Sequence, residues 1–114
     1  MCIRDRWCLA CDAPIHFPRE ACPDCLGDQL EFRAAEGSGT IYACSVMPRP
    51  ANATMAGREP YVVALIDLDE GVRTMSNVLV GPDGDPYSVR VGERVAIDWE
   101  PLGDGRHLPV FVRA

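Results

Sequence analysis

An all-β fold is predicted for this 114-residue chain, and two features of the sequence carry the prediction. Near the N-terminus, four of the six cysteines form two Cys-x-x-Cys pairs within a segment rich in turn-forming residues. Further along, five short runs of β-prone residues are separated by groups of glycine and proline, which interrupt regular structure. These features predict a cysteine-rich module over residues 7–36, followed by one five-stranded barrel over residues 37–114.

The first six residues, Met1 to Arg6, come before the cysteine-rich module. No apolar segment follows them, so we do not interpret them as a signal peptide, and we expect the chain in the cytoplasm. In that reducing compartment, paired cysteines bind metal more often than they form structural disulfides. We interpret residues 1–6 as a tail that is either non-native, as if translated from a sequencing adapter, or disordered. Cys2 is given no role, and the natural N-terminus is expected to lie upstream.

The two cysteine pairs have the spacing of a four-ligand metal site. Cys8 and Cys11 form the first pair, and ten residues separate them from the second pair, Cys22 and Cys25. Each Cys-x-x-Cys turn can place two thiolates on one ion, and two such turns complete a tetrahedron with no position left for water. Redox dithiols are less favoured, because neither pair begins a helix in a βαβ unit. We therefore predict one structural Zn²⁺, with a rubredoxin-type iron as the alternative.

The barrel strands are predicted in order along the rest of the chain. The first covers residues 40–47, and the next 13 residues, 48–60, hold three prolines and a glycine and form a long loop. Strands at 61–69 and 72–80 are joined by a tight turn at Glu70-Gly71 and form a hairpin. After a break at 81–86 and a short helical turn within 87–92, strands at 94–100 and 107–112 follow. Five short strands with this spacing favour an OB-fold barrel behind a four-cysteine zinc ribbon.

The second strand is apolar on both faces. One alternating set, either Val62, Ala64 and Ile66 or Tyr61, Val63 and Leu65, must fill the barrel. The other set is expected to face the ribbon or a partner, because exposed apolar patches usually mark contact sites. Several residues are assigned to the barrel core, namely Tyr42, Cys44, Tyr61 and Trp99. The two histidines, His16 and His107, have no carboxylate or nucleophile near them in sequence and are given no catalytic role.

Charge and motif content limit the classes of function. The net charge is −6, and the 11 basic residues are arginines that form no run, whereas nucleic-acid binders usually carry a basic patch. The longest apolar run, Tyr61 to Ile66, is too short to cross a bilayer. Ser-His-Asp triads, nucleotide-binding loops and dinucleotide fingerprints are not recognised in the sequence. A non-catalytic, non-membrane protein is therefore expected.

A specific set of runs resembles a known family over residues 7–114. The chain resembles the acyl-CoA-associated family of rubredoxin-like zinc ribbon plus OB-fold proteins. Many ribbons share the cysteines, so the Pro-Tyr-Val-Val-Ala run and the closing Leu-Pro-Val-Phe run make the resemblance specific. The matching runs are Cys8-x-x-Cys11, Pro18-Arg19, Cys22-Pro23-x-Cys25, Gly37-x-Gly39-Thr40-Ile41-Tyr42, Pro60-Tyr61-Val-Val-Ala-Leu-Ile66-Asp-Leu-Asp-Glu-Gly71, Gly92-Glu-Arg-Val95 and Leu108-Pro-Val-Phe111.

The resemblance implies a non-catalytic accessory subunit. Members of this family are partners of thiolases, thiolase-like lipid-transfer proteins and related CoA-ester enzymes, and some contribute to a shared CoA site. By implication, the barrel and the proline-rich loop of this chain meet a thiolase-fold partner or a CoA ester. Arg49 and Arg58 in that loop are the candidate phosphate contacts. Relatives usually begin with a helical segment before the ribbon, which this sequence does not show.

Two other functions remain open from the sequence. Ribbons and OB barrels also bind nucleic acids, which would require exposed aromatic residues with arginines beside them on the barrel face. An iron atom held by the four cysteines would instead make the chain a rubredoxin-like electron carrier.

Overall fold

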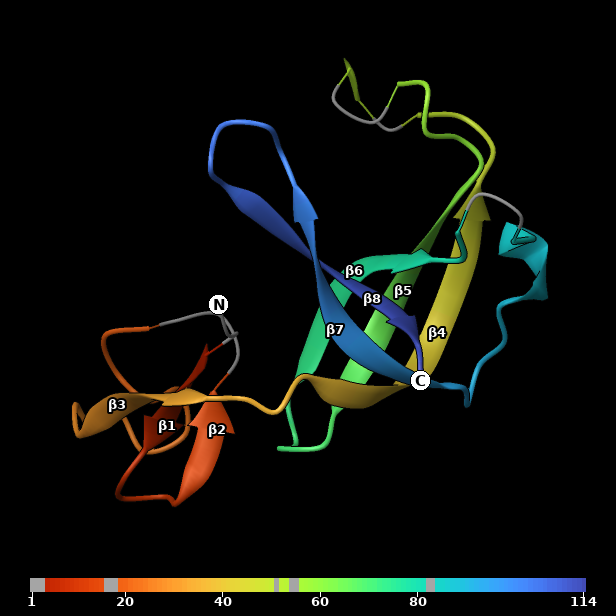
Figure 1. Cartoon of the computed structure of the whole chain (residues 1–114). Coiled ribbons are helices and arrows are strands. Elements are labelled where there is room, and N and C mark those ends of the chain that lie inside the picture. Colours follow the sequence, from red (N-terminus) through yellow and green to blue (C-terminus); the bar gives the residue numbers. More distant parts are fainter. Residues whose placement is uncertain (1–3, 16–18, 51, 54–55, 82–83) are drawn as a thin grey trace.

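The computed structural model describes residues 4–15, 19–50, 52–53, 56–81 and 84–114. Within these ranges the chain forms a small three-stranded sheet and a separate closed barrel, so the all-β prediction is confirmed. Figure 1 shows the sheet at one end of the molecule and the barrel at the other, joined by the segment that leaves β3.

The N-terminal sheet consists of β1 (Arg4–Cys8), β2 (Ala13–Ile15) and β3 (Leu30–Ala34), in the order β2-β1-β3. Both pairings are antiparallel. Cys8 lies opposite Ala13 on one side and Leu30 on the other, whereas Arg4 lies opposite Ala34. The sheet therefore has two distinct ends, one at the cysteines and one where β3 leads into the barrel.

The structure differs from the expected tail at residues 4–6. These residues form the first part of β1 and pair with residues 32–34 of β3, so ladder hydrogen bonds hold them. The expectation of disorder is therefore wrong for residues 4–6, while residues 1–3, including Cys2, lie outside the described residues. That residues 1–6 are non-native stays a prediction, and the division at residues 7–36 and 37–114 remains our proposal.

The barrel contains β4 (Ser38–Met47), β5 (Tyr61–Leu68), β6 (Arg73–Leu79), β7 (Arg94–Pro101) and β8 (His107–Arg113). It closes in the order β4-β5-β6-β8-β7, with β7 paired back to β4 and a parallel contact between β6 and β8. A short 3-10 helix, η2 (Pro86–Ser88), lies in the connection before β7 and corresponds to the expected helical turn. Each predicted strand agrees with an observed one to within two residues at both ends. The predicted OB-fold is thus confirmed.

One of the two alternating sets on β5 fills the barrel. Val62, Ala64 and Ile66 are at most 1% exposed and pack in the core, while Val63 and Leu65 are half-buried on the outer face. Cys44 packs against the core, as predicted. The other core residues come from every barrel strand, from the turn between β5 and β6 and from the connection after β6, and they are Ile41, Leu68, Val72, Val78, Val89, Val95 and Phe111.

The assignment of aromatic residues to the core needs correction. Tyr42 is 52% exposed, because the register of β4 against β5 shifts between Ile41 and Ala43 and leaves Tyr42 unpaired on the outside. The guanidinium of Arg73 lies 3.4 Å from the centroid of its ring. Tyr61 is buried but outside the core cluster, and Trp99 is half-buried.

The segment that enters the barrel depends on Gly37 and Gly39. Gly37 has a φ of +84°, and a Cβ there would lie 2.2 Å from Cγ2 of Ile97. A Cβ on Gly39 would lie 2.7 Å from the carbonyl oxygen of Asp67. The carbonyl of Gly37 also accepts a hydrogen bond from the backbone N–H of Ile97 at 2.7 Å. These glycines therefore permit the close contacts through which β4 meets both β5 and β7.

Substitution of Gly37 tests the importance of this close approach. Gly37→Ala should lower the free energy of unfolding by about 2–4 kcal/mol, because left-handed strain and overpacking against Ile97 add together. Gly103→Ala is the matched control, since its φ is +89° but no atom lies within 4 Å of its Cβ position. Gly103→Ala should lower the free energy of unfolding by only about 1–2 kcal/mol, because left-handed strain is its only cost. Urea unfolding measures both, and equal losses would contradict the packing argument.

Candidate metal centre and barrel groove

Four cysteine sulfurs meet at the end of the N-terminal sheet. Cys8 ends β1, Cys11 follows in the turn to β2, and Cys22 and Cys25 lie in the connection to β3. Their Sγ atoms all lie within 4.8 Å of one another, with Cys8 to Cys25 at 3.7 Å and Cys11 to Cys22 at 3.9 Å. A tetrahedral zinc with sulfurs at about 2.3 Å has sulfur–sulfur edges of about 3.8 Å. The spacing therefore fits one zinc ion bound by four thiolates.

Backbone hydrogen bonds shape the two cysteine turns. The N–H of Cys11 donates to Sγ of Cys8 at 3.4 Å in the first turn. In the second turn, the N–H of Leu26 donates to the carbonyl of Cys22, whose own N–H donates to the carbonyl of Gly27. A residue with positive φ follows the last cysteine of each turn, namely Asp12 at 52° and Leu26 at 62°. Both turns thus direct their sulfurs inward to the same point.

The cysteine thiols of the site differ in pKa. Hydrogen bonds from the backbone of Cys25 and Asp24 lower the pKa of Cys22 to about 7, because they stabilise its thiolate. Hydrogen bonding with the sulfurs of Cys25, Cys8 and Cys22 raises the pKa of Cys11 to about 12. Four adjacent thiolates require a cation to balance their charge, and a divalent metal can replace the protons that they otherwise share.

The zinc ribbon has a very small apolar core of its own. Cys8, Ile15 and Cys22 are buried, and Leu30 packs against them. Structural zinc sites can supply about 10–16 kcal/mol of apparent binding free energy, which becomes folding free energy when the unfolded chain has no site. The metal centre is therefore structural in character, and it compensates for the scarcity of buried aliphatic side chains.

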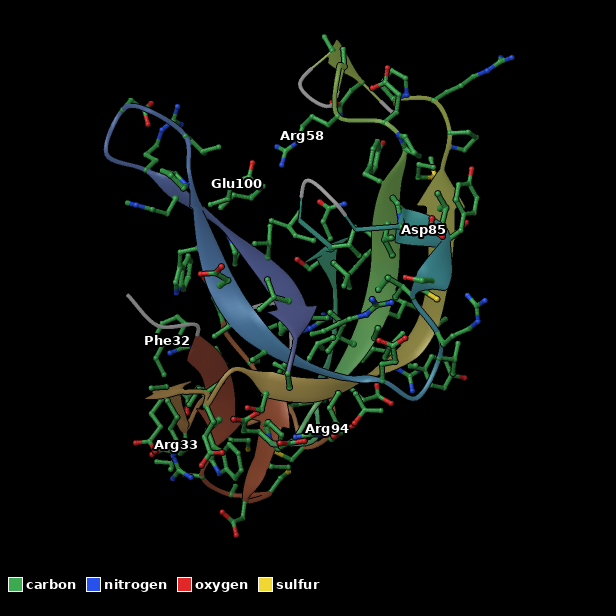
Figure 2. The ribbon with its side chains drawn as sticks, turned by 45° about the vertical axis from the view of Figure 1, so that its right-hand side comes forward. Phe32, Arg33, Arg58, Asp85, Arg94 and Glu100 are labelled. Carbon is green, nitrogen blue, oxygen red and sulfur yellow. The ribbon has the colours of Figure 1, made fainter. Side chains whose placement is uncertain are left out.

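A groove of about 570 Å³ opens beside β5 and β6 in the barrel. The walls are mainly apolar, and two charged groups, Arg58 and Glu100, stand among them as an ion pair. Arg58 comes from the loop before β5 and Glu100 from the end of β7, and Figure 2 shows the two labelled side chains directed toward each other. The remaining lining residues are Pro60, Tyr61, Val62, Asn77, Val78, Leu79, Val80, Gly81, Gly84 and Pro86.

The structure separates the two arginines proposed as CoA contacts. Arg58 lines the groove, and its side chain is 31% exposed beside a Glu100 side chain that is 22% exposed. Arg49 is exposed near the start of the loop and is not among the lining residues. Sequence reasoning missed Glu100, because its partner lies 42 residues away in sequence and nothing local signals the pairing.

A second hollow, of about 360 Å³, lies where the ribbon meets the barrel. Trp7 and Arg33 line its ribbon side, with the Arg33 guanidinium 4.5 Å from the Trp7 ring centroid. The N–H of Glu36 donates to Oε1 of Glu70 at 2.6 Å and links the two parts. On the barrel side, two hydrogen bonds from Arg94 hold the pKa of Asp69 below its usual range. Of these contacts, the Glu36–Glu70 hydrogen bond joins the ribbon to the barrel.

Two candidates from the sequence remain, and both are histidines. His16 lies outside the described residues, and His107 is half-buried, with no hydrogen bond to Nδ1 from the described protein atoms. Among the described residues, no helix has the length and apolar character needed to span a bilayer.

Two family models match consecutive parts of the chain. The model for the "ChsH2, rubredoxin-like zinc ribbon domain" matches residues 8–31. The model for the "ChsH2, C-terminal OB-fold domain" matches residues 32–100. A solved structure of the "Ltp2-ChsH2(DUF35) aldolase" is also similar, with a TM-score of 0.84 and 32% identity over 98% of this chain and 84% of that one.

Curated relatives share the region but differ in length. A "Probable enoyl-CoA hydratase alpha subunit" of Thermomonospora curvata is 34% identical over 91% of this chain, which spans 31% of the relative. A "DUF35 domain-containing scaffold protein" of Methanothermobacter thermautotrophicus is 37% identical over 77% of the chain and 64% of the relative. A protein of the same name from Methanocaldococcus jannaschii is 33% identical over 82% of the chain and 68% of the relative.

The metal assignment leads to a direct test. Purified protein should hold one zinc per chain by elemental analysis, and Cys8→Ser or Cys22→Ser should abolish binding and increase amide exchange throughout β1–β3. Cys44→Ser is the matched control, because Cys44 lies in the barrel with its Sγ 3.8 Å from the carbonyl of Val89, and it should keep the zinc. Properly reduced protein with a protected ribbon but no metal would contradict the assignment, and bound iron would favour the electron-carrier alternative.

Proposed function

Because the chain belongs to the ChsH2 family, which joins a rubredoxin-like zinc ribbon to an OB-fold domain, we propose that it is a non-catalytic accessory subunit of an acyl-CoA enzyme complex. Its partner in this proposal is a thiolase or a thiolase-like lipid-transfer protein. The observation that carries the proposal is the match of both parts of the chain, in order, to the structure of the Ltp2-ChsH2(DUF35) aldolase.

The names of the relatives support a role in assembly. Two archaeal relatives are called scaffold proteins, which describes binding rather than chemistry. Two other similar proteins carry enzyme names, hydratase subunit and aldolase, and both names are compatible with a subunit that works beside a catalytic one. In our proposal the partner supplies the reacting groups, and this chain supplies a rigid surface.

The metal centre suits such a role. Four protein ligands leave zinc no open position for water or substrate, so the ion stabilises the ribbon without taking part in a reaction. The ribbon is linked to the barrel by the hydrogen bond from the N–H of Glu36 to the carboxylate of Glu70. A partner would therefore meet one preformed surface.

The barrel groove is the proposed contact with a CoA ester. Its apolar walls suit a thioester chain, and the guanidinium of Arg58 could exchange the Glu100 carboxylate for a phosphate, which accepts the same charge-assisted hydrogen bonds. Arg49, exposed at the start of the same loop, would meet further phosphate oxygens when a ligand or partner approaches.

Nucleic-acid binding is less favoured by the arrangement of the charges. Tyr42 and Arg73 are stacked on the outer barrel face, as a base-stacking platform would require. However, Arg73 covers the ring and is also paired with Asp67 at 2.6 Å, while the chain as a whole carries a net charge of −6. Phosphate neutralisation requires clustered, available cations, so we expect only weak binding to single-stranded DNA or RNA at physiological salt.

The proposed partnership is tested by co-expression with a thiolase-fold enzyme and, in a separate experiment, with Ltp2. The chain should co-purify with the enzyme, and the isolated chain should show no turnover of CoA esters. The double substitution Arg49→Ala, Arg58→Ala should lower CoA-ester use by the complex, or its assembly, at least about tenfold, since each substitution removes one charge-assisted contact. Zinc content should not change.

Arg106→Ala is the matched control for the loop substitutions. Arg106 is a highly exposed arginine at the β7–β8 turn, where it pairs with Asp104, and its loss should leave assembly and turnover as in the parent. If the double variant also behaves like the parent, the loop is not a contact. Absence of a complex with the parent chain would contradict the proposed partnership itself.

A further inference from the structure

The end of the zinc ribbon presents two exposed leucines. Leu9 follows the first cysteine of the first turn and is 49% exposed, and Leu26 follows the last cysteine of the second turn and is 79% exposed. The two turns lie next to each other, because the N–H of Leu9 donates to the carbonyl of Gln29 at 2.8 Å. Ala10 and Pro23, one in each turn, are exposed as well. We call these four residues the ribbon tip.

Leu26 is unfavourable for the folded chain in two respects. Its φ of 62° lies in the left-handed region, where a residue with a Cβ is less stable than glycine. Its side chain also leaves most of its apolar surface in water. Glycine would adopt the same backbone conformation without either penalty, and asparagine tolerates it better than leucine does. Strained, exposed apolar residues tend to occur at functional sites, so the side chain of Leu26 points to a contact outside this chain.

Acidic side chains surround the ribbon tip. Asp24 and Asp28 lie two residues on either side of Leu26, Asp12 follows the first cysteine turn, and all three are exposed. Among the described residues, none of the three forms an ion pair. Residues 7–36 contain six acidic residues and only two arginines. A partner surface that fits this tip would therefore have an apolar pocket with a basic rim.

The ribbon tip lies at the end of the molecule remote from the barrel. Cys8 pairs with Leu30 at the start of β3, whereas the opposite end of β3 leads into β4. Figure 1 shows β3 running from the ribbon toward the barrel, so the cysteine turns are free to enter a recess in another protein. The bound metal would hold both turns in place, which limits the entropy lost on binding.

We propose that the ribbon tip docks in an apolar, basic-rimmed pocket on the partner enzyme, with Leu9 and Leu26 as its anchors. This inference rests on the proposed function, and it places the main protein contact on the ribbon rather than on the barrel loop. The barrel groove then remains available for a small ligand, and the two surfaces have separate roles.

The test compares variants that change the ribbon tip without disturbing its backbone. Leu26→Gly and Leu26→Asn suit the positive φ, so each zinc-loaded variant should keep its zinc and show an unchanged or raised melting temperature. Each should nevertheless weaken binding to a purified Ltp2-type enzyme by about tenfold or more, because a buried leucine contact is lost. Leu9→Ser should act in the same direction, and Asp24→Asn with Asp28→Asn should flatten the salt dependence of the affinity.

Met75→Ser is the control for a general loss of apolar surface. Met75 is 68% exposed on the barrel strand β6, and its substitution should leave the affinity unchanged. Calorimetric titration of the zinc-loaded proteins separates the outcomes. If the parent binds and the Leu26 variants bind equally well, the ribbon-tip proposal is overturned while the proposed function stands. If Met75→Ser weakens binding as much as Leu26→Gly, the specific anchor is overturned, and if the parent does not bind, both proposals fail.

Discussion

The convergence of four sulfur atoms is the constraint on which the N-terminal ribbon of this protein depends. The ribbon buries few aliphatic side chains, and its sheet has strands of only three to five residues, so packing alone contributes little to its stability. A zinc ion between Cys8, Cys11, Cys22 and Cys25 would hold both turns and the start of β3. Because β3 continues into β4, order at the metal also helps to define where the ribbon stands relative to the barrel.

The barrel is stabilised by apolar packing, so its loops do not have to stabilise the fold. Its core is a continuous apolar cluster drawn from every strand, closed by the tight passage of Gly37 and Gly39 past β5 and β7. Its long loop and the β7–β8 hairpin are consequently free to carry the polar pair Arg58 and Glu100 beside the groove. The pair is moderately exposed, so its energetic contribution to folding is small. Its position beside the groove instead suits an arginine that could release the Glu100 carboxylate and pair with a bound anion.

Much of this arrangement could be predicted from sequence because it depends on local signals. The glycine and proline breaks defined the five barrel strands, the alternation in β5 offered two core sets, and the cysteine spacing indicated the metal site. The features that were missed depend on distant contacts or on backbone geometry. Tyr42 faces outward because of a register shift, and Arg58 meets Glu100 through the closure of the barrel. The strands of the ribbon are too short to show periodicity. The left-handed conformation of Leu26 could not be predicted, because leucine is not a residue that favours positive φ.

We propose that this chain supports the chemistry of another protein and performs none itself. The most direct measurement is the rate of CoA-ester turnover by a fixed amount of an Ltp2-type enzyme as the zinc-loaded chain is added. We expect no turnover by the chain alone, and a rate that rises with added chain and levels off at a fixed stoichiometric ratio. Turnover by the isolated chain, or a rate that does not change when the chain is added, would rule out a non-catalytic accessory role.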